Sequence, residues 1–94
     1  MTIGAGAKVG SHCIFHTAAI IDHKAVIGDF VQIGAGSIIN SEATIEEGAF
    51  IGSGVTVVAG VTVGKGARVG AGSVVIGSVG KNETVFGNPA AKIK

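Results

Sequence analysis

The sequence predicts an all-β fold, a parallel solenoid in which every six residues form one short strand and one corner. Three observations support this prediction: a six-residue apolar period, a second column of compact residues, and glycines confined to two phases of that period. An amphipathic helix needs apolar residues three and four positions apart, and a half-buried strand needs continuous alternation. A strict period of six fits neither pattern.

The strands are expected around the apolar residue that opens each hexad. Thirteen hexads follow one another from position 3 to position 75 without an insertion or deletion. All but one open on Ile or Val, and four residues later each carries a compact residue, from Ala7 to Val79. The openers, which we expect to point inward, are Ile3, Val9, Phe15, Ile21, Ile27, Ile33, Ile39, Ile45, Ile51, Val57, Val63, Val69 and Val75.

The corners are expected where the glycines stand. Of the 17 glycines, seven follow an opener by one residue and seven follow an opener by three residues. Glycine restricted to two phases indicates corners that need a positive φ or a close approach of two backbones, and it argues against a disordered linker. The first phase comprises Gly4, Gly10, Gly28, Gly34, Gly52, Gly64 and Gly70, and the second Gly6, Gly36, Gly48, Gly54, Gly60, Gly66 and Gly72.

Composition excludes several classes of protein. The 94 residues suit one domain, and although the mean hydropathy is +0.61, no apolar run approaches the roughly 18 residues that span a bilayer. The chain enters the repeat at Ile3 without a leader segment, so we expect a cytoplasmic protein without a membrane partner. The single cysteine, Cys13, cannot form an intrachain disulfide. A net charge of +1 and 4% aromatic residues give no indication of nucleic-acid binding.

Two segments are more specific than the repeat. Residues 16–30, which contain Asp22-His23-Lys24, resemble the catalytic coil of the sialic acid O-acetyltransferases and amino-sugar N-acetyltransferases, and residues 85–93 resemble the ending that many such enzymes share. Together with the hexads, they make the whole chain similar to the hexapeptide-repeat acyltransferases. This resemblance implies a single-stranded left-handed parallel β-helix over residues 1–80, built from four to five triangular coils of 18 residues, and a short C-terminal cap over residues 81–94.

Three faces follow from an 18-residue coil, because side chains alternate along a strand and the residues that flank an opener point outward. The first face is the most apolar, and a contiguous apolar column suggests an interface. We interpret it as the contact of a homotrimer, the assembly that the resemblance implies. This face comprises Ile20, Asp22, Ile38, Asn40, Thr56, Val58, Val74 and Ile76.

The resemblance assigns the role of general base to His23, with Asp22 beside it as a second catalytic residue. A neutral imidazole, whose unperturbed pKa is near 6.5, suits the removal of the proton that an acceptor nitrogen or oxygen loses as it attacks a thioester. Two acceptor-binding residues are also expected: His16, where similar enzymes often carry Asn, and Asn40. Lys24 departs from the family pattern, which favours an acidic residue directly after this histidine.

Acetyl-CoA is the co-substrate that the resemblance implies. Gln32, which replaces a common His, is expected near the acetyl group, and the corners that carry Ser53 and Ala71 are expected along the coenzyme. These corners lie on a different edge from His23, so a complete cleft needs a partner chain. We therefore expect an acetyltransferase that acts on an amino or hydroxyl group of a small acceptor, a sugar or nucleotide-sugar. The acceptor, the choice between O- and N-acetylation, the need for an N-terminal acceptor-binding domain and the basic residues that meet the coenzyme phosphates stay open.

Two alternatives compete with this interpretation. A non-catalytic trimeric scaffold or assembly module is favoured by Lys24 and by a layout without an acceptor domain. A γ-class carbonic anhydrase has the same β-helix but holds zinc with three histidines. His12, His16 and His23 fall on successive hexads of one coil, which does not reproduce that geometry, so no metal site is expected.

Overall fold

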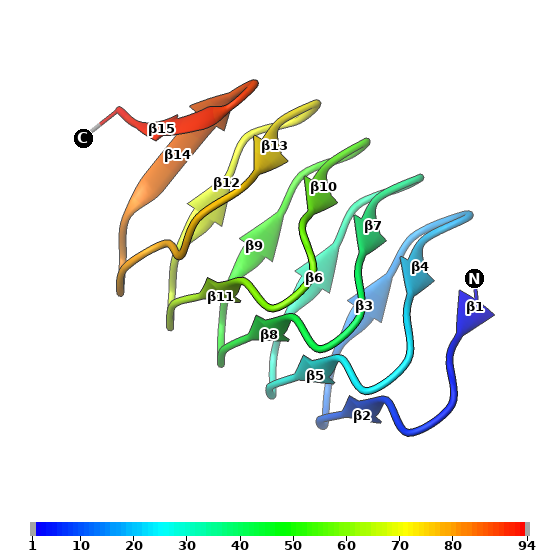
Figure 1. Cartoon of the computed structure of the whole chain (residues 1–94). Coiled ribbons are helices and arrows are strands. Elements are labelled where there is room, and N and C mark those ends of the chain that lie inside the picture. The colour runs from blue at the N-terminus through cyan, green and yellow to red at the C-terminus, as the bar shows by residue number, and fades with distance from the viewer. Residues whose placement is uncertain (1, 94) are drawn as a thin grey trace.

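The chain winds into a three-sided prism whose coils follow one another from the N-terminus to the C-terminus (Figure 1). The computed structural model describes residues 2–93, so Met1 and Lys94, the outer ends of the two predicted regions, lie outside the described residues. Residues 2–93 contain no helix, and every strand except the last two is two residues long. The strands are β1 (Thr2–Ile3), β2 (Lys8–Val9), β3 (Ile14–Phe15), β4 (Ile20–Ile21), β5 (Val26–Ile27), β6 (Gln32–Ile33), β7 (Ile38–Ile39), β8 (Thr44–Ile45), β9 (Phe50–Ile51), β10 (Thr56–Val57), β11 (Thr62–Val63), β12 (Arg68–Val69), β13 (Val74–Val75), β14 (Thr84–Gly87) and β15 (Ala90–Lys92).

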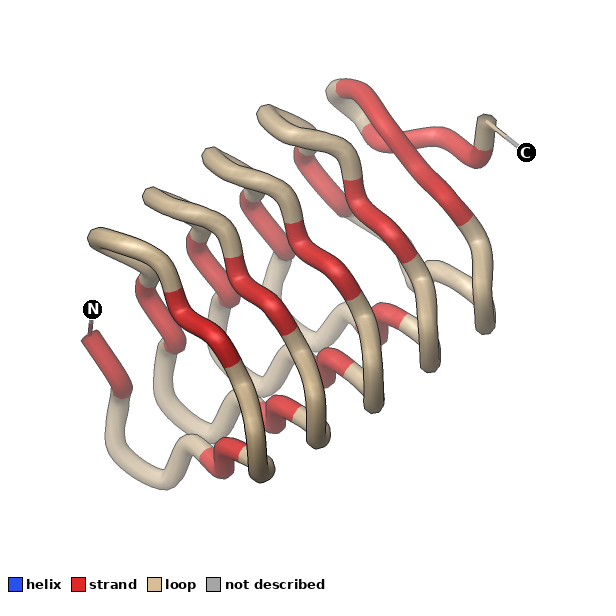
Figure 2. Tube along the Cα trace, turned by 180° about the vertical axis from the view of Figure 1, so that it is seen from behind, coloured by secondary structure: helices blue, strands red, loops and turns tan. Residues whose placement is uncertain are grey.

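The strands stack into three sheets, one along each side of the prism, and every strand pair is parallel except β14 with β15 (Figure 2). Sheet A has the order β1-β4-β7-β10-β13, sheet B the order β11-β8-β5-β2, and sheet C the order β15-β14-β12-β9-β6-β3. Partners such as Ile20 and Ile38, or Gln32 and Phe50, lie 18 residues apart along the chain. This register confirms the predicted coil length, and the chain is a left-handed parallel β-helix of about five coils.

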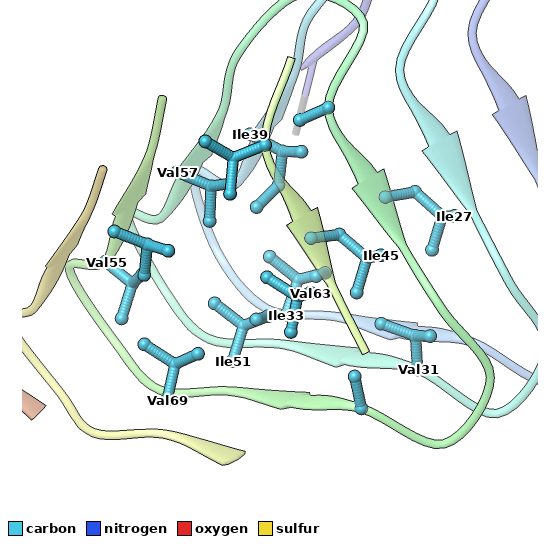
Figure 3. Packing of buried hydrophobic residues seen from close by; sticks show 14 of the residues in the cluster. Ile27, Val31, Ile33, Ile39, Ile45, Ile51, Val55, Val57, Val63 and Val69 are labelled. Atoms are coloured by element: carbon cyan, nitrogen blue, oxygen red, sulfur yellow. The ribbon is translucent and has the colours of Figure 1, made fainter. Parts of the chain in front are cut away.

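The openers point into the prism, as the sequence predicts. Figure 3 shows several of them packed against one another along the axis, and the openers from Ile21 to Val75 are fully buried or nearly so. Burying one Ile side chain stabilises a fold by about 1.5–3 kcal/mol relative to leaving it exposed, so this column holds the coils together. Ile3 and Val9 in the first coil are 46% and 38% exposed, because no described coil packs beneath them.

Glycine occurs in its two phases for two different physical reasons, a positive φ and a close approach of two backbones. All seven glycines three residues after an opener have a positive φ, between 67° and 76°. In the other phase the constraint is space: a Cβ on Gly34 would lie 2.5 Å from the backbone C of Gly52 and the backbone N of Ser53. Glycine thus suits the corners at one position by its conformation and at another by the close stacking of coils. At the first of these positions, five other corners hold a residue with a side chain at a similar positive φ: His12, Ala18, Lys24, Phe30 and Glu42.

The last coil is shorter than the sequence period predicts. Val79 bridges Val63, and Thr84 pairs with Arg68, so these partners are sixteen residues apart along the chain. The expectation that Val79 belongs to the column of compact residues is therefore wrong, because the tighter link after β13 moves it into the place of an opener. β15 then turns back antiparallel on β14, within the region predicted as the cap.

Candidate active site

His23 lies in the corner that joins sheet A to sheet B, directly after β4 and Asp22. The equivalent corner one coil later carries Ser41, since Ile21 pairs with Ile39. Backbone hydrogen bonds hold the two corners together: the Glu42 N–H donates to the His23 carbonyl at 3.2 Å. The side chains of His23 and Asp22 are 54% and 44% exposed, so the ring is reachable from solvent.

Asp22, His23 and Ser41 form one contact cluster around a single ring nitrogen. The Oδ1 atom of Asp22 lies 3.3 Å from Nδ1 of His23, and the Oγ atom of Ser41 lies 3.1 Å from the same Nδ1. The Asp22 carboxylate also accepts the backbone N–H of His23 at 2.7 Å. Both side chains can meet because His23 stands in a corner, where the strict alternation of a strand does not apply.

When Nδ1 carries the proton, this arrangement leaves Nε2 of His23 as the basic nitrogen. An ionised carboxylate only accepts hydrogen bonds, so the contact with Asp22 is favourable when Nδ1 carries the proton. The neutral imidazole then has its lone pair on Nε2. A side chain with one oriented and one free nitrogen is suited to act as a general base.

The pKa of Asp22 is lowered from its ordinary value. The main cause is the backbone N–H of His23, followed by the His23 ring, and the Ser41 hydroxyl contributes in the same direction. Because these groups favour the charged form, the carboxylate persists to a lower pH than that of an unperturbed aspartate.

Gln32, Ser53 and Ala71 lie away from His23 in the single chain. Gln32 points outward from β6 on sheet C and is exposed. Ser53 and Ala71 occupy successive corners between sheets C and A, which are linked by the Gly72 N–H donating to the Ser53 carbonyl at 2.8 Å. Sheet A separates this edge from the edge of His23, and residues 2–93 of one chain enclose no pocket.

The two predicted acceptor residues lie in different places. Asn40 follows β7 in the coil above Asp22, where its Nδ2 donates to the Val57 carbonyl at 2.8 Å. His16 follows β3 on sheet C and is exposed. The structure thus brings Asn40, but not His16, to the corner of Asp22 and His23.

Sequence reasoning missed Ser41. The signal that could have found it is its spacing, since it stands one full coil after His23 in the same column. In the part of the chain that the structure describes, no three His, Cys, Asp or Glu side chains gather to hold a metal ion. No helix capable of crossing a membrane is present there either.

Comparison with known proteins gives matches to one family and to several solved structures. Residues 42–77 match the family described as bacterial transferase hexapeptide (six repeats). The chain superposes over 98% of its length on a mutant GDP-perosamine N-acetyltransferase from Caulobacter crescentus, in complex with CoA and GDP-perosamine, with a TM-score of 0.95, 31% identity and 44% of that chain covered.

Two proteins from Neisseria gonorrhoeae are also similar. The acetyltransferase domain of PglB, in complex with acetyl coenzyme A, matches 98% of this chain and 51% of its own, with a TM-score of 0.85 and 32% identity. The serine acetyltransferase matches 95% of this chain and 38% of its own, with a TM-score of 0.91 and 26% identity. The chain thus spans about half the length, or less, of these structures. No curated protein sequence matches it.

Proposed function

The chain belongs to the hexapeptide-repeat acyltransferase superfamily, and on this premise we propose that it transfers the acetyl group of acetyl-CoA to an amino or hydroxyl group of a small acceptor. The observation that carries the proposal is the cluster at His23. Its Nδ1 contacts Asp22 and Ser41, which leaves Nε2 available as a base.

The proposed reaction needs a single proton acceptor. The acceptor nitrogen or oxygen attacks the thioester carbonyl while Nε2 of His23 removes its proton, and a tetrahedral oxyanion forms. When the intermediate collapses, the carbon–sulfur bond breaks and the departing CoA thiolate takes the proton from His23. Asp22, kept ionised by its lowered pKa, stabilises the imidazolium that exists between these two steps.

The acceptor that best fits the comparisons is a nucleotide-linked amino sugar. The Caulobacter crescentus enzyme, in complex with CoA and GDP-perosamine, matches 98% of this chain over 44% of its own length. We assign Asn40 to acceptor binding, because it lies one coil above Asp22. His16 is assigned to the acceptor of a neighbouring chain, since in its own chain it is on sheet C.

A homotrimer would complete the site. Sheet A exposes Ile20, Val58 and Ile76, an apolar surface suited to a contact between copies of this chain. The edge of His23 and the edge of Ser53 and Ala71 flank this sheet, so packing on it would bring the base of one chain to the coenzyme corner of another. Gln32 would then lie beside the thioester.

Acetyl-CoA binding and turnover test the proposal directly. We expect titration calorimetry of the purified protein to show acetyl-CoA binding, and a thiol-release assay to show acetyl transfer to a nucleotide-linked amino sugar. The compartment that we propose for this reaction is the cytoplasm. Failure to bind acetyl-CoA at millimolar concentration would instead support the non-catalytic scaffold.

A further inference from the structure

Ser41 is the one side chain of the His23 cluster that comes from another coil. Its Oγ lies 3.1 Å from Nδ1 of His23, closer than the Asp22 oxygen at 3.3 Å. Ser41 is half-buried, whereas the His23 side chain is 54% exposed. The ring therefore lies against a better-fixed neighbour, and this contact restricts its rotation.

We propose that Ser41 is a positioning residue, which works with Asp22 to keep the proton on Nδ1 of His23 and the lone pair on Nε2. The hydroxyl accepts a hydrogen bond from Nδ1–H and can donate its own proton to the Asp22 carboxylate, which closes a ring of three groups. The Ser41 hydroxyl lowers the pKa of the Asp22 carboxyl, as a hydrogen bond donated to the carboxylate does. The inference about the position of the ring proton is independent of the proposed function. Only the use of Nε2 as a base in acetyl transfer rests on that function.

The backbone of the two corners fixes this geometry. The Glu42 N–H donates to the His23 carbonyl at 3.2 Å, and the Gly60 N–H donates to the Ser41 carbonyl at 3.1 Å. The Ser41 hydroxyl is therefore carried on a corner that is hydrogen-bonded to the coils on both sides. A side chain held in this way can orient an exposed ring at little further entropy cost.

Lys24, the residue directly after His23, packs against the preceding coil at Gly6. Its backbone has a φ of 58°, and its N–H donates to the Ala5 carbonyl in the preceding coil at 3.0 Å. Its Cγ lies against Gly6, at 3.4 Å from where a Cβ of that glycine would stand. Lys24 thus packs towards the N-terminal coil, while the support for the ring comes from Asp22 and from the coil that follows.

The chain itself offers variants that should fold. Ala5 and Ala59 occupy the same corner column one coil before His23 and one coil after Ser41, so alanine is already accommodated there. Ser41→Ala removes the hydroxyl alone, and Ser41→Thr keeps it. Ser11→Ala, at an exposed corner between sheets B and C, serves as the matched serine control.

The nitrogen resonances of the His23 ring test the inference without any need for turnover. In 15N long-range NMR spectra of the whole protein at a pH where the ring is neutral, with His23 assigned by its loss in His23→Gln, we expect a protonated Nδ1 and an unprotonated Nε2. Ser41→Ala should bring the two nitrogen shifts towards each other as the second tautomer becomes populated. Ser41→Thr and Ser11→Ala should keep the wild-type shifts.

Kinetics provide the second readout. Ser41→Ala should lower kcat by about five- to tenfold, the effect of one lost hydrogen bond, with an unchanged KM for acetyl-CoA and partial rescue in Ser41→Thr. Wild-type shifts in Ser41→Ala, or an unprotonated Nδ1 in the native protein, would overturn the inference. If the wild-type protein shows no acetyl transfer, the proposed function fails and the nitrogen shifts alone decide the role of Ser41.

Discussion

Replacing Ser37 with alanine should destabilise the fold through one corner, the corner that carries Ser53. Ser37 is fully buried, and its hydroxyl donates to the Gly52 carbonyl at 2.6 Å and accepts the Val55 N–H at 3.1 Å. Other corners close with a backbone bond instead, as when the Ser37 N–H donates to the Gly34 carbonyl at 3.2 Å. In the next coil, the Ser37 hydroxyl thus bridges the Val55 N–H and the Gly52 carbonyl, in place of a direct backbone hydrogen bond between them.

The magnitude follows from what Ser37→Ala leaves behind. Alanine fits the space, because Ala19 holds the equivalent position one coil earlier and is also fully buried. If the corner relaxes and Val55 N–H bonds to Gly52, the loss is about one hydrogen bond, or roughly 0.5–1.5 kcal/mol. If Val55 N–H stays unpaired in the core, the cost rises towards about 3 kcal/mol. We therefore expect a decrease of about 0.5–3 kcal/mol in the free energy of unfolding.

Urea unfolding at a fixed protein concentration measures this change. A constant concentration is needed because any oligomer adds a concentration-dependent contribution to stability. Ser11→Ala, at an exposed corner, should change the midpoint little. A Ser37→Ala protein as stable as the wild type would refute the reasoning, since a buried hydroxyl with two partners would then contribute nothing.

Four further predictions follow from the site and the corners. His23→Ala should reduce kcat by about 10²–10⁴-fold while circular dichroism stays unchanged, and near-normal turnover would remove His23 from its role as base. Ile20→Asp should place a charge on the apolar face of sheet A and shift the protein to monomers in analytical ultracentrifugation; an unchanged oligomer would exclude that face. Gly36→Ala, at a φ of 70° with open space around it, should cost about 1 kcal/mol in urea unfolding, so an unaltered midpoint would contradict the conformational reason for this glycine. Asp22 has a lowered pKa in the folded protein, so its stabilising contribution is present above the unfolded-state pKa and is lost as the pH falls through the lower folded value. In Asp22→Asn, the free energy of unfolding should therefore fall less steeply as the pH is lowered through the acidic range. The same pH profile in the variant and the wild type would count against the contact with His23.

Much of the fold was predictable because the repeat fixes which positions stack. A strict six-residue period assigns each opener to the interior, and the fully buried column from Ile21 to Val75 confirms this assignment. The positive φ at glycines such as Gly36 also follows from their phase alone. The period predicted the wrong column for Val79, because a shorter link after β13 changes the register by two residues. No local sequence pattern indicates this shorter link.

The candidate site was predictable only in part. Resemblance gave Asp22 and His23, and the 18-residue coil placed Asn40 above Asp22. The spacing of Ser41 places it one coil after His23, but spacing alone does not show whether its hydroxyl meets the ring. Its contact with Nδ1 at 3.1 Å depends on the conformations of two corners and two side chains.

By itself, then, the sequence determined the column in which each residue as far as β13 stands, because the period of six is a property of the chain. Only the tertiary structure decided which neighbours in a column touch, as Ser41 does with His23 and Ser37 with the Gly52 corner. The physical reason is that stacking brings coils within hydrogen-bonding distance, while corner φ angles and side-chain rotamers choose the partners.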